Sequence, residues 1–264
     1  MRFPRYQALF HSLSLQLKEL QLDTNQLRAL HELQRQLIRA VLSVERRVLR
    51  LKRARNRLTR LKARERLPKA RAAGVKALTA AIDSRIGGLH QVLFLLRCFG
   101  DGIAFTYQSK YALKHLMFDE NYRAKQTPGF ITGKQGFKRE YRVLCSGFSA
   151  GVPVVLSDIT NIIRHGDVCA LAGSDPVPIE VKSSRTSRER PQRQMSQLQV
   201  LADFYKNDGA TNFRGTPNVR RTELSTEETK HEGVMNDCIR RAMATGHTTE
   251  EPEEGLRYIA VASL

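Results

Sequence analysis

Two apolar repeats near the N-terminus constrain the fold of this chain more than any other feature of its sequence. The first repeat consists of Leu37, Val41, Val44, Val48, Leu51 and Leu58. The second consists of Val75, Leu78, Ile82, Ile86, Leu89, Leu93 and Leu96. Steps of three and four residues place apolar side chains on one face of a helix, and they are typical of helices that pack along a shared seam.

The two repeats predict an antiparallel helical hairpin within residues 7–98. Pro68 lies between them, where a helix is expected to stop or restart. Each arm has about 30 residues and would extend about 45 Å at 1.5 Å per residue. The same seams are also compatible with a coiled coil between two chains, so a homodimer or larger complex through this region stays open.

Most of the positive charge of the chain lies in this helical region. The net charge is +18, and residues 46–76 alone contain 14 Lys or Arg and one acid, Glu65. A solvated helix usually mixes charges of both signs to gain ion pairs, whereas one sign alone favours an anionic partner. We expect nucleic acid there, with docking to a partner protein as the alternative. The expected contacts are Arg46, Arg47, Arg50, Arg53, Arg57, Arg60 and Arg64.

Beyond residue 98 the pattern changes to short mixed elements. Turn signals at Gly100–Asp101–Gly102 and Thr127–Pro128–Gly129 mark residues 101–135 as a connector. The expected order from residue 136 is a helix at 136–144, strands at 152–156, 167–172 and 177–182, a helix at 190–206, a polar segment at about 207–256 with one helix near 234–243, and a strand at 256–262.

The segment 166–184 predicts a hairpin that brings three chemically active residues together. Residues 173–176 have the composition of a turn, and both flanks have the composition of strands. If the chain folds back between residues 173 and 174, Asp167 lies opposite Glu180, with Cβ atoms about 5 Å apart. Lys182 lies on the same face, two residues further along.

Two facing carboxylates repel each other unless a cation lies between them. Hard oxygen ligands completed by water and phosphate suit Mg²⁺, with Mn²⁺ as a substitute. Such an ion activates water, and Lys182 can orient that water or stabilise charge on a phosphate. Asp167, Glu180 and Lys182 therefore predict a site for phosphodiester hydrolysis, although an ordinary salt-bridged hairpin end remains the plain alternative.

With this triplet, the chain resembles the PD-(D/E)xK nuclease superfamily, the fold of restriction endonucleases. The resemblance covers about residues 136–264 and implies an α+β fold with an αβββαβ core, preceded here by the long helical hairpin or coiled coil. It implies that Glu140, on the first core helix, joins Asp167 and Glu180 as a metal ligand. It also implies that a glutamine of the helix after the triplet, Gln194 or Gln197, faces the site. Gly166 departs from the proline that is common before the acid.

Several other polar residues lie near the hairpin in the sequence. For Asp158 we favour a turn cap through Thr160 over a place in the metal site, because Asp commonly bonds its own backbone in turns. A lone loop histidine such as His165 is usually exposed and idle. Arg185, Arg188 and Arg193 directly follow the catalytic strand, where we expect them to contact a substrate backbone.

Together these features predict a helical arm at residues 1–100, the connector at 101–135 and a nuclease domain at 136–264 with the polar insertion at about 207–256. The expected function is Mg²⁺-dependent hydrolysis of nucleic acid, most readily DNA, in defence against foreign DNA or in DNA processing. The alternatives are a non-catalytic nucleic-acid-binding protein with a nuclease-like fold, or an assembly subunit. We find no long apolar run and no clustered Cys or His for zinc, and we expect a cytoplasmic protein without a membrane partner.

Overall fold

The computed structural model describes residues 4–64, 67–118, 121, 123, 129–181, 189–222 and 229–262, without the side chains of residues 189–195. The chain divides into two compact units, residues 1–220 and 221–264. The first unit combines long helices with small antiparallel sheets, and the expected segments 1–100 and 101–135 both lie within it. No helix in the described ranges combines the length and the apolar character needed to cross a membrane.

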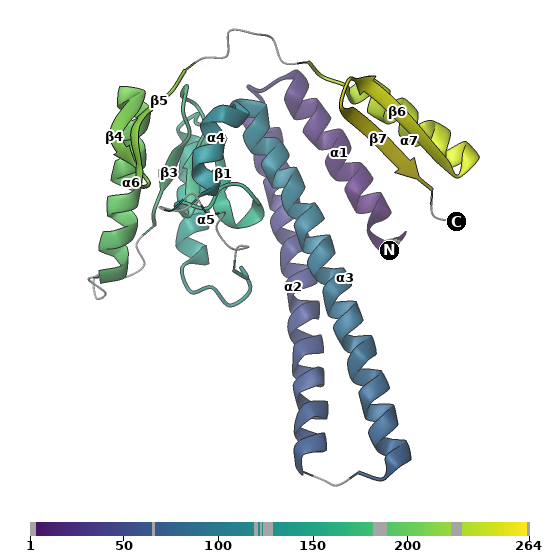
Figure 1. The fold of residues 1–264 in the computed structure, drawn as a ribbon. Coiled ribbons are helices and arrows are strands. Elements are labelled where there is room, and N and C mark those ends of the chain that lie inside the picture. Colours follow the sequence, from purple (N-terminus) through teal and green to yellow (C-terminus); the bar gives the residue numbers. More distant parts are fainter. Residues whose placement is uncertain are drawn as a thin grey trace. The chain divides into compact units, whose positions relative to one another are not determined.

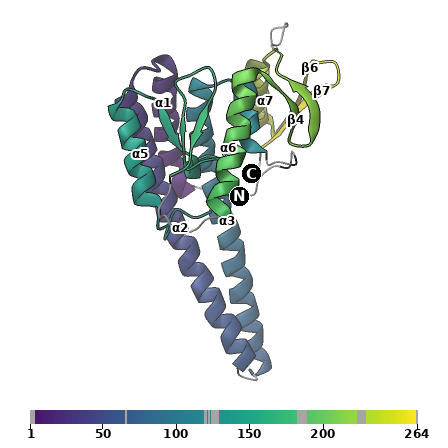
Figure 2. The ribbon, with the colours of Figure 1, turned by 90° about the vertical axis from the view of Figure 1, so that its left-hand side faces the viewer.

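The predicted helical hairpin is confirmed. After a short 3-10 helix, η1 (Pro4–Tyr6), come α1 (Gln7–Leu22), α2 (Leu27–Arg64) and α3 (Lys69–Tyr107). Pro68 is the N-cap of α3, as its fixed φ allows. Helices α2 and α3 run side by side and extend together beyond the rest of the first unit (Figures 1 and 2). The seam residues buried between them near the base are Leu37, Val41, Val44, Val48, Ile82, Ile86, Leu89, Leu93 and Leu96.

Helix α3 is longer than predicted, and the expected turn at Gly100–Asp101–Gly102 is wrong. These residues lie within α3, and the glycines serve close packing there. A Cβ on Gly100 would lie 2.0 Å from the carbonyl oxygen of Ile159, and one on Gly102 would lie 2.5 Å from a methyl carbon of Leu17. The close approach of Ile159 and Leu17 therefore explains glycine at both positions, although glycine costs up to about 1 kcal/mol relative to alanine in a helix.

The small sheet that follows has the predicted strands. Helices α4 (Lys110–Met117) and α5 (Phe137–Ser149) precede β1 (Val154–Leu156), and the 3-10 helix η2 (Ser157–Ile159) separates β1 from β2 (Val168–Ala170) and β3 (Val177–Ile179). The strands pair antiparallel in the order β1-β2-β3. Strand β1 is fully buried, as its uniformly apolar sequence favours.

The basic helices and the sheet share one hydrophobic core. That core runs from Leu13 in α1 through the α2–α3 seam to β1, β2 and α6. Gln34 of α2 is fully buried and forms hydrogen bonds with the outer edge of β1 through both groups of its amide. Its Nε2 donates to Val154 O at 2.7 Å, and its Oε1 accepts from Leu156 N at 3.1 Å. The helical arm therefore packs against the sheet in one shared core, and α2 covers the outer edge of β1.

The remaining elements include strands that were not predicted. Helix α6 (Glu189–Asn207) leads into a hairpin of β4 (Gly209–Phe213) and β5 (Thr216–Arg220). The second unit contains α7 (Glu232–Thr245), which confirms the helix expected near 234–243, then β6 (His247–Glu253) and β7 (Leu256–Val261). The expected final strand is present as β7, but it pairs with β6 rather than with β1–β3 in the described residues. Exposed and half-buried residues alternate along 247–253, which suits a hairpin with one solvated face.

Candidate active site

The predicted register of the hairpin that contains Asp167 and Glu180 is confirmed. Val168 pairs with Ile179, and the two further pairs of the ladder keep the same offset. Asp167 lies directly before β2, where its backbone N–H donates to Ile179 O at 2.8 Å. Its side chain is fixed as well, because Val181 N donates to Asp167 Oδ2 at 2.9 Å. Ile179 and Val181, the neighbours of Glu180, therefore hold the backbone and the side chain of Asp167.

The glycine that departs from the family pattern has a structural reason. Gly166 adopts φ +72°, a conformation that proline cannot take because its ring fixes φ near −65°. A Cβ at this position would also lie 2.8 Å from Ile179 N. The close approach of the chain to β3 therefore requires glycine before Asp167.

Three carboxylates from different elements converge on one ammonium. Lys134 Nζ lies 2.9 Å from Glu140 Oε2, 2.8 Å from Asp158 Oδ2 and 3.1 Å from Asp167 Oδ1. Glu140 lies in the first turn of α5, and Asp158 lies in η2. Two of these acids, Glu140 and Asp167, are predicted site residues. For Asp158 the cap that we favoured from the sequence is wrong, since its carboxylate binds Lys134 instead.

A buried carboxylate of the basic arm positions the turn that carries Lys134. Glu45 of α2 is 0% exposed, and it accepts hydrogen bonds from Ile131 N at 3.1 Å and Thr132 N at 2.8 Å. Lys134 N in turn donates to Ile131 O at 3.0 Å. The arm therefore fixes the segment from which the ammonium reaches the three acids.

Arg97 of α3 contacts both Glu45 and the segment that contains Asp158. Its guanidinium lies 3.7 Å from Glu45 and donates through Nε to the carbonyl oxygen of Asp158 at 3.2 Å. Burial lowers the pKa of Arg97, and the neighbouring carboxylates of Glu45 and Asp158 oppose this shift. An arginine remains charged under such a perturbation. Arg97 thus connects the buried acid of the arm with the turn that contains Asp158.

The electrostatics of the cluster are those of acids held around a cation. Burial lowers the pKa of Lys134, but the charges of Asp158, Glu140 and Asp167 outweigh it, so that the net shift is upward. Burial also raises the pKa of Glu140, which Lys134 counteracts while Asp167 and Asp158 add to it. Like charges in one site disfavour ionisation, and the ammonium is what allows three carboxylates to share this space.

The other predicted site residues are only partly described. Glu180 follows β3 and is half-buried. Gln197 lies on α6 and lines a cavity beside His165, which is buried rather than exposed. Lys182, Arg185 and Arg188 lie outside the described residues. Gln194 and Arg193 lie within α6, but their side chains fall outside the described part.

The basic face expected on the arm is present on α2. Arg47 differs from the other expected contacts, because it is half-buried and donates to the hydroxyl of Tyr6 at 2.5 Å. The guanidinium also lies 6.0 Å from the centre of the Tyr6 ring. The expected nucleic-acid contacts that are exposed are Arg46, Arg50, Arg53, Arg57, Arg60 and Arg64.

Sequence reasoning missed Lys134, because no local pattern marks it. It lies in the Gly133–Gly136 turn, and its three partners lie 6 to 33 positions further along the chain. Only the packing of α5, η2 and β2 against this turn brings the group together. In the described part of the chain, no cluster of three or more His, Cys, Asp or Glu residues is spaced to hold a metal ion. The three acids are spaced around an ammonium, at hydrogen-bond distances rather than at the shorter distances of metal ligands.

Comparison with known proteins gave no match to any protein-family model, curated protein or solved structure.

Proposed function

We propose that this protein is a divalent-metal-dependent nuclease that hydrolyses phosphodiester bonds of nucleic acid, most readily DNA. The observation that carries the proposal is the convergence of Glu140, Asp158 and Asp167 on one point, with Glu180 on the strand that fixes Asp167. Three acids that meet from α5, η2 and the position before β2, with Glu180 directly after β3, are more than a salt-bridged hairpin end requires. The resemblance to the PD-(D/E)xK superfamily assigns roles to three of these four.

The donor chemistry of the cluster suits Mg²⁺ or Mn²⁺, since all the ligands are carboxylate oxygens. Glu140, Asp158 and Asp167 would hold the ion, with Glu180 as a further donor, once Lys134 no longer occupies their centre. The bound ion would supply an activated water and neutralise charge on the phosphate.

The chain's own residues supply orientation and charge. The hydrogen bond from Val181 N holds Asp167 Oδ2, which leaves Oδ1 directed at the centre of the cluster. An ammonium such as that of Lys134 stabilises the negative charge that builds on a phosphate during hydrolysis. Lys182, in the (D/E)xK position, is proposed for the same task or for orienting the water.

The arm supplies affinity for the polyanion. From Arg46 to Arg64, α2 carries ten Lys or Arg residues and no acid. Contacts between such a face and phosphates release bound counterions, so binding is sequence-independent and weakens steeply with salt. Phosphate contacts of this kind position a duplex without reading its bases.

A non-catalytic nucleic-acid-binding protein is the second candidate, and one observation favours it. Lys134 already bridges the three acids, and the described residues contain no group spaced for a metal. In that case the cluster serves to hold the 129–134 segment, α5 and η2 together, and the arm alone defines the activity.

Cleavage of plasmid DNA and of labelled RNA in Mg²⁺ distinguishes the two candidates. The nuclease proposal expects nicking or linearisation by the wild type that is lost on chelation, in Asp167→Asn and in Lys182→Ala. Asp203→Asn is the matched control, because Asp203 is exposed on α6 and accepts a hydrogen bond from Gln199 of the same helix. No cleavage in Mg²⁺ or Mn²⁺, with salt-sensitive binding intact, would establish the binding protein instead.

A further inference from the structure

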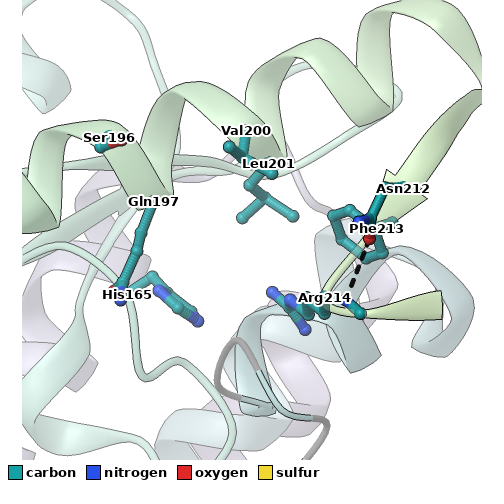
Figure 3. Close-up of a pocket in the computed structure, with 9 residues that line it drawn as sticks. His165, Ser196, Gln197, Val200, Leu201, Asn212, Phe213 and Arg214 are labelled. Atoms are coloured by element: carbon teal, nitrogen blue, oxygen red, sulfur yellow. Dashed lines mark hydrogen bonds between the residues drawn. The ribbon is translucent and has the colours of Figure 1, made fainter.

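A cavity of about 650 Å³ lies within the first unit. Three segments line it: the face of α6 that carries Gln197, the tip of the β4–β5 hairpin with Arg214, and the loop before β2 with His165 (Figure 3). The volume is in the range of pockets that hold small ligands. His165 is two residues before Asp167, so their Cα atoms are at most about 7.6 Å apart.

The tip of the hairpin keeps an arginine where the backbone favours other residues. Phe213 pairs with Thr216, so that Arg214 and Gly215 form a two-residue turn, with φ of +54° and +81°. Asn-Gly is the preferred sequence for such a turn, and an arginine at positive φ is strained. A residue kept at a position where its backbone conformation is unfavourable often has a functional role, and here that role would belong to the guanidinium.

The guanidinium of Arg214 is turned back over the protein. It lies 4.8 Å from the centre of the Phe213 ring, and its Nη2 donates to His115 O at 2.5 Å. Figure 3 shows it on the cavity side of the hairpin tip, facing the space below α6. These contacts fix the position of the positive charge at one end of the cavity.

The other walls carry hydrogen-bonding and apolar groups. Gln197 extends from α6 toward His165 (Figure 3). Asn212 Oδ1 accepts from Gly215 N at 3.1 Å, which orients its amide. Between them, Val200 and Leu201 form an apolar stretch of the wall. His165 Nε2 lies 2.8 Å from Phe118 O, which can only accept, so this nitrogen carries a proton.

This combination points to the chemical class of the ligand. Among the residues that the structure describes, the lining contains an arginine and no acid, and a guanidinium suits a phosphate. The two side-chain amides suit the polar edge of a flat heterocycle, as Asn and Gln do with bases, while the apolar stretch suits its face.

We propose that the cavity binds one nucleotide, with Arg214 at its phosphate and Gln197 and Asn212 at the edge of its base. Because His165 of the cavity wall is two residues before Asp167, the proposal deepens the nuclease function and rests on it: the bound unit is a nucleotide of the strand next to the bond that is cut. A free mononucleotide would present the same chemistry, and the test separates the two sources.

The test measures binding in EDTA, so that it does not depend on metal or on cleavage. The probes are the four deoxynucleoside 5′-monophosphates, inorganic phosphate, and a short single-stranded oligonucleotide. Val200→Trp fills the cavity from a side chain that is 47% exposed, so the fold tolerates it. Leu15→Trp on α1 is the matched control, since Leu15 is 48% exposed and lies outside the cavity. Arg214→Asn removes the guanidinium and places a preferred residue in the turn.

We expect Val200→Trp and Arg214→Asn each to weaken nucleotide binding at least tenfold, while Leu15→Trp binds as the wild type does. The melting temperature of Arg214→Asn serves to show that its loss of binding is not unfolding. A loss confined to the oligonucleotide identifies a strand nucleotide, and a loss confined to a monophosphate identifies a free nucleotide. Unchanged affinity for every probe in both variants overturns the proposal.

The outcome is separable from that of the nuclease proposal. If Asp167→Asn abolishes cleavage but Val200→Trp binds and cleaves as the wild type does, the nuclease proposal is supported and the nucleotide pocket is refuted. If nucleotides bind in the cavity but the wild type cuts no nucleic acid, the nucleotide pocket is supported and the nuclease proposal is refuted.

Discussion

Replacing Glu45 with alanine should destabilise the protein strongly, because this one carboxylate joins the arm to the candidate site. It is 0% exposed, accepts two backbone N–H groups and lies 3.7 Å from the guanidinium of Arg97, whose side chain is 6% exposed. Removing one partner of a buried ion pair costs about 3–5 kcal/mol, since the remaining charge stays buried without its counterion.

Arg97 keeps its hydrogen bond to the carbonyl oxygen of Asp158, which places the expected cost of Glu45→Ala toward the lower end of that range. For a unit of this size, each kcal/mol lowers the melting temperature by about 2–4 °C, so we expect a decrease of about 10 °C. Urea denaturation followed by far-UV circular dichroism measures the free energy of unfolding directly.

Glu32→Ala is the matched control, because Glu32 lies on the same helix in an exposed ion pair with Arg35. Such pairs contribute about 0–1 kcal/mol. The reasoning is refuted if the two variants unfold within about 0.5 kcal/mol of each other, since the buried network would then contribute no more than a surface pair.

Three further predictions follow from the same structure. Gln34→Leu should cost about 2–5 kcal/mol by urea denaturation, because it leaves two buried backbone groups of β1 without partners; a cost below 1 kcal/mol would contradict this. Gly100→Ala should prevent stable folding, since its Cβ would lie 2.0 Å from a carbonyl oxygen, whereas Gly87→Ala, with open space around it, should raise stability by about 0.5–1 kcal/mol; equal melting temperatures would refute both. Burial, with a smaller contribution from Asp23, raises the pKa of Tyr107 to about 12. The protonated hydroxyl therefore makes its full contribution to stability below pH about 10, and this contribution is lost as the pH rises through about 12. Ultraviolet titration of the folded protein should show a tyrosine that ionises near pH 12 in the wild type and is missing in Tyr107→Phe.

The sequence predicted those elements whose signals are local. The seams from Leu37 to Leu58 and from Val75 to Leu96 predicted α2 and α3, because the periodicity of a long helix is repeated many times. The offset between Asp167 and Glu180 predicted the register of β2 and β3, because a turn composition fixes where the chain folds back.

The features that the sequence did not predict depend on contacts between distant segments. Gly100 and Gly102 have the composition of a turn, and only the approach of Ile159 and Leu17 explains them within a helix. Lys134 lies in a short turn, and nothing in its neighbours along the chain indicates that three acids surround it. The charge pattern of the arm likewise gave no sign that its Glu45 is buried under the candidate site.

The central claim is that the cluster of Glu140, Asp158 and Asp167 is a metal site, and Mn²⁺ binding measured by electron paramagnetic resonance tests it most directly. The account predicts that the wild type, with a non-cleavable oligonucleotide present, binds Mn²⁺ at a site that Asp167→Asn loses and the exposed control Asp203→Asn keeps. Equal Mn²⁺ binding by all three proteins, or none by the wild type, would contradict the account and leave the cluster as a structural salt bridge.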